Sequence, residues 1–165
     1  KRLKPIAPLA LDSFVAPKIP GNRGYAVRAL WYVVNAVAFQ SSFFGLLPSE
    51  CKAGLLRLFG AEVGSGLVMK PGVSIKYPWF LELGNNVWIG ERVWIDNHTT
   101  VRVGNNVCIS QGAYIFTGNH DWKSRSFPFF CKPVEIGDGV WITAFQKVIP
   151  GTVIPAGHAL IDGES

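Results

Sequence analysis

His120 is the side chain of this sequence best suited to acid–base chemistry, and it stands in residues 117–122, which read Thr-Gly-Asn-His-Asp-Trp. An imidazole titrates near neutral pH, so a histidine held in place can take a proton from a reacting group and later return it. Of the two other histidines, His98 is expected at a corner of the fold and His158 lies near the end of the sequence. The sequence therefore indicates His120 as a candidate general base.

Aliphatic residues recur every six positions from residue 63 onward, on both sides of that segment. The runs are Val63, Met69, Ile75 and Leu81; Leu83, Ile89, Ile95 and Val101; Val103, Ile109 and Ile115; and Ile136, Ile142, Val148, Ile154 and Leu160. A period of six does not match the 3.6 residues of a helical turn, and an alternating strand needs no turn former at every sixth position. One short strand and one corner do fit six residues, with Gly or Asn at the corner, as in 84–86 and 104–106. Three such units close a triangular turn, so the sequence predicts an all-β solenoid, a β-helix whose stacked turns bury an aliphatic column.

The six-residue rhythm fails between Ile115 and Ile136, which predicts a loop insertion at about residues 116–133. Insertions in solenoids form loops on one face, frequently the binding face. His120 stands at the root of this loop, where the coil beneath would fix it while solvent still reaches it.

The sequence divides by charge into residues 1–60, a basic and apolar N-terminal segment, and residues 61–165, the predicted β-helix domain. The first part carries eight Lys or Arg against two acidic residues, a net +6, and the second carries eight against nine, a net −1. Nucleic-acid binding needs a basic stripe through the body, so we expect no nucleic-acid partner. A basic, apolar N-terminus suits an anionic membrane surface better.

Residues 23–44 are apolar almost throughout and predict a helix. Three polar residues interrupt it: Arg28, Asn35 and Gln40. This helix can cap the end of the solenoid, lie in a membrane interface with Lys18 and Arg23 near anionic lipid, or span the membrane, for which its polar residues suit it poorly. A second helix over residues 49–59, ended by Gly60, is expected to lead into the first coil.

Three cysteines, Cys51, Cys108 and Cys131, follow neither a disulfide framework nor a zinc-binding spacing, and they predict free thiols in a reducing cytosol. The sequence begins at Lys1 and stops at residues 162–165 without a closing signal. We therefore expect residues to be missing at both ends.

Four stretches, in order, carry a resemblance to a known family. They are Leu-Leu-Arg-Leu-Phe-Gly-Ala at 55–61, Ile-Lys-Tyr-Pro-Trp at 75–79, Trp-Ile-Gly-Glu at 88–91 and Ile-Ser-Gln-Gly-Ala-Tyr at 109–114. By these stretches and its hexads, the sequence resembles the hexapeptide-repeat acyltransferases with a left-handed parallel β-helix. Among them it resembles the WcaF-type colanic acid biosynthesis acetyltransferases. The left hand of the helix is implied by the resemblance alone.

The resemblance implies acetyl transfer from acetyl-CoA to a hydroxyl of a sugar in exopolysaccharide (colanic-acid-like) biosynthesis, with His120 as the general base. It implies a substrate-binding role for Asn97, and Asp121 would orient the imidazole, bind acceptor hydroxyls or only cap the loop. The aromatic residues Trp122, Phe127 and Phe129 can stack on a sugar ring or serve packing alone.

The same resemblance places the pantetheine arm of acetyl-CoA along Thr143 and Ala144, although Thr143 departs from the family's usual small residue. It implies a homotrimer, because the donor site is shared between subunits. We expect a cytoplasmic protein, peripheral at the inner face of a bacterial membrane, with membrane contact through residues 18–44.

Other functions remain open from the sequence: acetylation of a serine-type or xenobiotic-type acceptor, or a non-enzymatic trimeric β-helical scaffold. Zinc-dependent carbonic anhydrases share the fold and need three converging histidines. One of these histidines would be expected five residues after His120, but this sequence has Arg125 there, so we expect no metal site.

Overall fold

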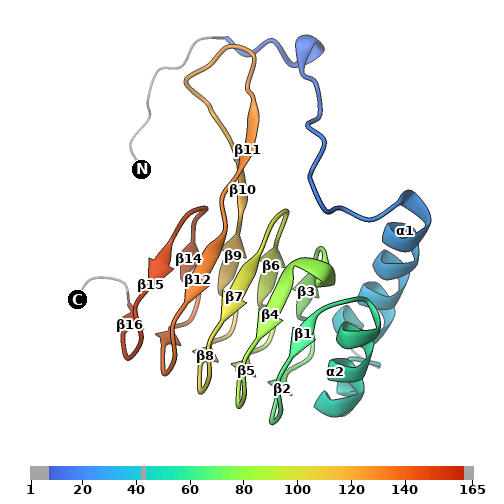
Figure 1. Ribbon diagram of the computed structural model, residues 1–165, viewed down its shortest axis with the longest axis vertical. Helices are drawn as coiled ribbons and strands as arrows, with labels where there is room; N and C mark the ends of the chain where they lie inside the picture. Colours follow the sequence, from blue (N-terminus) through green and yellow to red (C-terminus); the bar gives the residue numbers. More distant parts are fainter. Residues whose placement is uncertain (1–7, 42–43, 162–165) are drawn as a thin grey trace.

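The computed structural model describes residues 8–41 and 44–161, and most of the second range forms a prism walled by three parallel sheets (Figure 1). The first sheet holds β1 (Glu62–Val63), β4 (Leu81–Leu83), β7 (Val101–Val103), β12 (Val134–Ile136) and β15 (Val153–Ile154). The second holds β2 (Val68–Met69), β5 (Trp88–Ile89), β8 (Cys108–Ile109), β13 (Trp141–Ile142) and β16 (Ala159–Leu160). The third holds β3 (Ser74–Ile75), β6 (Trp94–Asp96), β9 (Tyr114–Phe116) and β14 (Lys147–Val148). The parallel β-solenoid predicted from the hexads is confirmed.

Each coil repeats the register of the coil before it. Glu82 of β4 pairs with Glu62 on one side and with Arg102 on the other, and Arg102 then pairs with Glu135 across the insertion. The hexad aliphatic residues point inward, and all of them are buried except Val63 and Leu160 at the two ends, which are partly buried. The core is therefore one continuous column along the prism.

The corners between the first and second sheets form a polar ladder. The Asn85 amide N–H donates to Asn105 Oδ1 at 2.9 Å, and the Asn105 N–H donates to Asp138 Oδ1 at 2.7 Å. Asn86 and Asn106 both take the left-handed backbone conformation, with φ of 56°. Asn accepts this conformation at lower cost than most residues, which is why it recurs at the corner.

Gly84 tests how tightly the corners stack. A Cβ at this position would lie 2.7 Å from the carbonyl carbon and oxygen of Gly104, and these backbone atoms cannot move aside as a side chain could. We expect Gly84→Ala to lower the free energy of unfolding by about 1–3 kcal/mol. Gly54→Ala, on an exposed helical position with open space around it, is the control and should raise it by about 0.4–1 kcal/mol. Urea denaturation measures both, and equal effects would contradict close stacking.

Two N-terminal helices cover the open end of the first coil. Helix α1 (Tyr25–Val34) continues as the wider π-helical turn η2 (Asn35–Gln40), and the short turn η3 (Phe44–Leu46) precedes α2 (Ser49–Leu58). Helix α2 ends at Leu58, and Gly60 follows it with a φ of +92° and an N–H that donates to the Arg57 carbonyl oxygen at 2.9 Å. Both helices lie beside β1–β3 (Figure 1).

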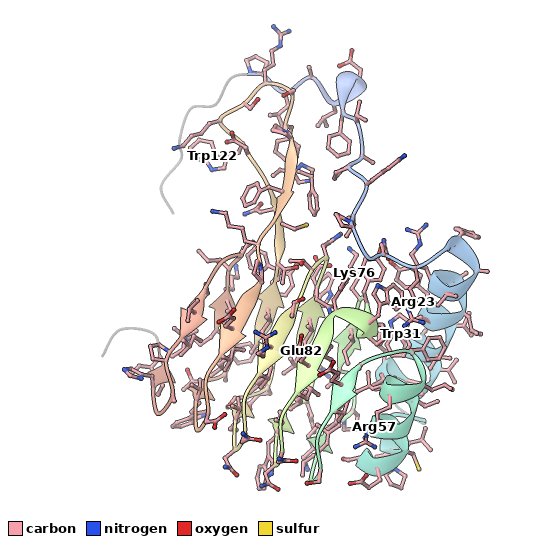
Figure 2. All side chains as sticks on the ribbon, viewed as in Figure 1. Arg23, Trp31, Arg57, Lys76, Glu82 and Trp122 are labelled. Atoms are coloured by element: carbon pink, nitrogen blue, oxygen red, sulfur yellow. The ribbon has the colours of Figure 1, made fainter. Side chains whose placement is uncertain are left out.

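The helices cap the exposed strand edges with side chains. Trp31 Nε1 donates to the Ile75 carbonyl oxygen at 2.8 Å, and the Ile75 N–H donates to Asn35 Oδ1 at 3.2 Å. Figure 2 shows Trp31 between α1 and the coils. These two bonds satisfy the free edge of β3, since an unpaired strand edge leaves backbone groups without partners.

The other two sheets are closed in the same way. The buried Lys52 Nζ donates to the Met69 carbonyl oxygen of β2 at 3.0 Å, and burial lowers the pKa of this amine. Arg57 donates to the carbonyl oxygens of Val63 at 3.0 Å and Gly64 at 2.8 Å beside β1. Of the three interpretations of the N-terminal helix, these contacts show the cap, and they leave the outward side chains Leu30 and Val33 exposed. No helix within residues 8–41 or 44–161 combines the length and apolarity that crossing a bilayer requires.

The predicted insertion leaves the prism as an antiparallel hairpin of β10 (Gly118–His120) and β11 (Phe129–Cys131). Residues 8–24, which include the single turn η1 (Leu11–Ser13), run from the hairpin tip down to α1 (Figure 1). The Ala10 N–H donates to the Arg125 carbonyl oxygen at 3.0 Å, which ties the two segments together. Residues 8–24 and the hairpin therefore both lie over the corners that follow β3 and β6, and side chains from all of them line one cavity.

Candidate active site

A cavity of about 830 Å³ lies between residues 14–23, the first turns of α1, the corners that follow β3 and β6, and the two strands of the hairpin. Phe14 and Lys18 line it from the N-terminal segment, Lys76 and Asp96 from the coils, and His120 from the hairpin. This volume suits a ligand of the size of a sugar with a substituent. His120 thus stands at the wall of this cavity, near the root of the insertion.

His120 is held by its own hairpin in one tautomer. Its Nδ1 lies 2.8 Å from the carbonyl oxygen of Phe127, and a carbonyl oxygen can only accept, so Nδ1 carries the hydrogen. In the neutral ring the lone pair then sits on Nε2, the atom that can take a proton. This geometry is what a general base requires.

Three aromatic rings surround the imidazole. Phe127 stacks on it with ring centroids 4.1 Å apart and planes 7° apart, while Phe129 and Phe14 contact it at 5.1 Å and 5.4 Å. Phe127 has a φ of 49°, an unusual backbone for a bulky residue, and this turn directs both its ring and its carbonyl oxygen to His120. Phe127 and Phe129 thus pack on His120, and Phe129 also lines the cavity, so stacking of its ring on a sugar stays a prediction.

Among the described residues that line the cavity, Asp96 is the one carboxylate. Lys76 Nζ lies 2.9 Å and His98 Nε2 3.5 Å from its Oδ1, and the Tyr114 hydroxyl donates to Oδ2 at 3.2 Å. Burial alone would raise the pKa of Asp96, but the polar contacts of His98 and Lys76 with its carboxylate together hold it at about 2. Burial and the Asp96 charge in turn raise the pKa of Tyr114 to about 12. Asp96 is therefore an anion at any pH at which the protein works.

The depressed pKa of Asp96 makes a prediction for stability against pH. The ordinary pKa of an aspartate is 3.8, so the contribution of the Asp96 charge to the free energy of unfolding is complete above about pH 5. This contribution is lost as the pH falls toward 2. We expect Asp96→Asn to lower the free energy of unfolding relative to wild type, and this loss should be roughly 2 kcal/mol larger at pH 6 than at pH 2. Urea unfolding of both proteins at several pH values measures this, with Glu91→Gln, an exposed carboxylate outside the cavity, as control. A difference that does not change with pH would contradict the ion-paired arrangement.

Asn97, predicted to bind substrate, is fully buried and does not line the cavity. Its Oδ1 accepts from the Tyr77 N–H at 3.0 Å and its Nδ2 donates to the Tyr77 carbonyl oxygen at 2.7 Å. Both ends of the amide are thus used to hold Tyr77, which does line the cavity. The geometry supports a structural role for Asn97 and does not favour contact with substrate.

The two predicted hairpin residues follow His120 but face outward. Asp121 is exposed, and its Oδ1 accepts from the Lys123 N–H at 3.0 Å, which is the loop-capping alternative. Trp122 is 39% exposed with Lys123 Nζ 5.8 Å from the ring centroid, and Figure 2 shows it on the side of the hairpin away from residues 8–24. Neither is among the residues lining the cavity.

The predicted donor residues lie on a later coil, apart from this cavity. Thr143 Oγ1 donates to the Leu160 carbonyl oxygen at 2.8 Å, and Ala144 is half-buried at the turn after β13. Their contact with the pantetheine arm stays a prediction.

Several lining residues were missed from the sequence: Phe14, Arg23, Arg28, Lys76, Asp96 and His98. The hexad pattern places Asp96 one position after an inward Ile95, which could have marked it as a wall residue. The N-terminal residues carry no such signal, because nothing in the pattern predicts that this segment returns over the hairpin.

Within residues 8–41 and 44–161, no three His, Cys, Asp or Glu side chains gather as a metal site would need. The site is thus a histidine beside a charged cavity on a β-solenoid, which defines a hexapeptide-repeat protein with a candidate acid–base centre.

Comparison with known proteins gives the family. No family model matches the chain. It is 38% identical over 149 residues to a protein of Escherichia coli K12 named "Putative colanic acid biosynthesis acetyltransferase WcaF", covering 89% of this chain and 80% of that protein. It is 28% identical over 112 residues to the galactoside O-acetyltransferase of the same organism, covering 65% and 55%.

Solved structures share the fold. A hexapeptide-repeat-containing acetyltransferase of Vibrio cholerae O1 biovar eltor, complexed with acetyl coenzyme A, matches with a TM-score of 0.58 and 21% identity, over 79% of this chain and 82% of that one. A maltose O-acetyltransferase of Clostridium difficile 630 matches with a TM-score of 0.51 and 18% identity, over 83% and 78%. Given its fold and the 38% identity to WcaF, the chain belongs to the hexapeptide-repeat acetyltransferases.

Proposed function

We propose that this acetyltransferase moves an acetyl group from acetyl-CoA to a sugar hydroxyl in exopolysaccharide biosynthesis, with His120 as the general base. The observation that carries the proposal is the Nδ1–H bond from His120 to the Phe127 carbonyl oxygen, which leaves Nε2 free to accept a proton at the cavity. The relatives support the donor and the acceptor class, since one solved neighbour holds acetyl coenzyme A and another relative is a galactoside O-acetyltransferase.

The reaction needs a base that removes one proton from the sugar hydroxyl and later gives the same proton to the CoA thiolate. His120 Nε2 removes the hydroxyl proton as the sugar oxygen bonds to the thioester carbonyl carbon, because a neutral sugar hydroxyl is too weak a nucleophile. The tetrahedral intermediate then collapses, the carbon–sulfur bond breaks, and the CoA thiolate takes the proton from Nε2. Throughout, the Phe127 carbonyl oxygen keeps its bond to Nδ1–H and stabilises the transient imidazolium.

A homotrimer with its donor site between subunits is the assembly we propose. Three tryptophans stand on the outer faces of the prism, Trp88, Trp94 and Trp141, and are 59%, 50% and 51% exposed. Exposed aromatic side chains on a regular surface favour an interface, where Trp is enriched. Thr143, close after Trp141, would then contact the pantetheine arm along such an interface.

We also propose a cytoplasmic protein that touches the inner membrane face through α1. Its outward side chains are apolar, with Leu30 58% and Val33 60% exposed, and the N-terminal segment is basic. Co-sedimentation with phosphatidylglycerol vesicles should fall for Val33→Asp and not for Val153→Asp, a comparably exposed change on β15. Equal sedimentation of the two variants would overturn this contact.

Titration calorimetry with acetyl-CoA, together with the mass of the protein in solution, tests the proposed function. We expect saturable binding at about one site per subunit of a trimer, and acetylation in a panel of sugar acceptors. A well-folded chain that binds no acetyl-CoA would contradict the transferase mechanism and favour the scaffold alternative. Transfer to serine or to a xenobiotic hydroxyl but to no sugar would keep the mechanism and replace the acceptor.

A further inference from the structure

The cavity beside His120 carries an excess of positive charge. Of its described lining residues, four are cationic and one is a carboxylate. The cations are Lys18 and Arg23 of the N-terminal segment, Arg28 of α1 and Lys76 after β3. Asp96, the carboxylate, is already engaged by Lys76 and His98. Three positive charges therefore face the cavity without compensation from its described walls.

None of these three cations has a carboxylate partner within residues 8–41 and 44–161. The Arg28 Nε atom is buried and has no hydrogen-bond partner there. The Arg23 guanidinium lies 5.7 Å from the ring centroid of Trp79, a contact that leaves its charge available. Lys18 is exposed at the rim. A buried guanidinium nitrogen without a partner is costly, which points to an anionic group that completes the site.

We propose that Lys18, Arg23 and Arg28 form a phosphate-binding subsite of the acceptor pocket, so that the acceptor is a sugar carrying a phosphate or diphosphate. This inference rests on the proposed function, since it concerns the acceptor of the same reaction. Guanidinium groups present planar pairs of donors that fit phosphate oxygens. Three uncompensated charges match a diphosphate better than the single charge of a uronic acid.

The donor also carries phosphates, but its shape separates them from this subsite. In acetyl-CoA the reacting thioester and the diphosphate lie at opposite ends of the pantetheine arm. A donor whose thioester reaches His120 therefore keeps its diphosphate away from the cavity that holds His120. The cationic groups share that cavity with His120, so they are placed for the acceptor.

Titration of inorganic pyrophosphate into the full chain tests the subsite. We expect saturable binding that Arg28→Gln and Lys18→Gln each weaken about tenfold, because a hydrogen bond to a charged group contributes that much or more. Lys147→Gln, an equal charge change on exposed β14, is the control and should leave binding unchanged. Lys18 is exposed, so its variant reports on the charge even if Arg28→Gln perturbs packing.

Competition separates the sources of the phosphate. Displacement of pyrophosphate by UDP-glucose would support a soluble nucleotide-linked acceptor, and displacement only by phosphatidic acid vesicles would support a lipid-borne one. Pyrophosphate that binds no tighter than glucuronate, or that binds equally to all the variants, would overturn the proposal. So would an equal loss of acetyl-CoA affinity in Arg28→Gln, since the cations would then serve the donor. Pyrophosphate binding by a chain that binds no acetyl-CoA would keep the subsite and refute the proposed function instead.

Discussion

Replacing His120 by alanine is expected to lower the rate of acetyl transfer by about 10²–10⁴-fold while leaving the fold intact. The reason is chemical: without Nε2 no described group at the same position can take the proton of the attacking hydroxyl. His120 is half-buried against Phe127 and Phe129, so the variant also loses packing, and its folding has to be checked by circular dichroism. Steady-state rates with acetyl-CoA and an accepted sugar measure the effect.

His158→Gln is the matched control for this prediction. His158 is exposed on the last described coil, and its Nδ1 lies 3.0 Å from the Ala156 carbonyl oxygen, the same kind of bond that holds His120. It is absent from the cavity lining. Its replacement should leave the rate unchanged, and a His120→Ala enzyme that retains wild-type turnover would contradict the assignment of the base.

Trp31→Ala is expected to produce the largest loss of stability, about 3–5 kcal/mol of unfolding free energy. Trp31 is fully buried, and its ring contacts Phe39 at 5.5 Å and Phe59 at 5.1 Å. The substitution also leaves the Ile75 carbonyl oxygen at the strand edge without its donor. Because this residue joins the helical cap to the first coil, its loss weakens both.

Two variants separate these contributions. Trp31→Phe keeps most of the apolar volume and removes the donor, so it should cost about 1–3 kcal/mol. Leu30→Ala, the neighbour on the same helix, is 58% exposed and should change stability by at most about 0.5 kcal/mol. Urea denaturation followed by Trp fluorescence and by circular dichroism gives all three values. A Trp31→Ala protein as stable as Leu30→Ala would mean that the cap does not fold together with the solenoid.

The prism could be predicted from the sequence because its signal is local and repeated. Ile75, Ile95 and Ile115 mark three successive turns, and each is fully buried on the same sheet of the prism. The insertion was equally visible, since a repeat shows its own interruption. His120 stood at the root of that insertion and does lie on the cavity wall.

The remaining parts of the site depend on contacts between distant residues, which no periodicity reports. The Ala10–Arg125 bond carries the N-terminal segment to the hairpin, and only this return brings Phe14 to His120. Asn97 shows the converse: its place in the sequence suggested a substrate contact, but its amide is used up by the Tyr77 backbone. The type of a residue and its position in the sequence do not reveal which backbone groups its side chain will hydrogen-bond in the fold.

A crystal structure of the chain with acetyl-CoA tests the central claim most directly. The mechanism predicts that the thioester enters the cavity from the solenoid surface, with its carbonyl carbon close enough to His120 Nε2 for a sugar oxygen to lie between them. Thr143 and Ala144 should contact the pantetheine arm. An ordered acetyl-CoA whose thioester lies away from His120 would contradict the assignment of this cavity as the site of acetyl transfer.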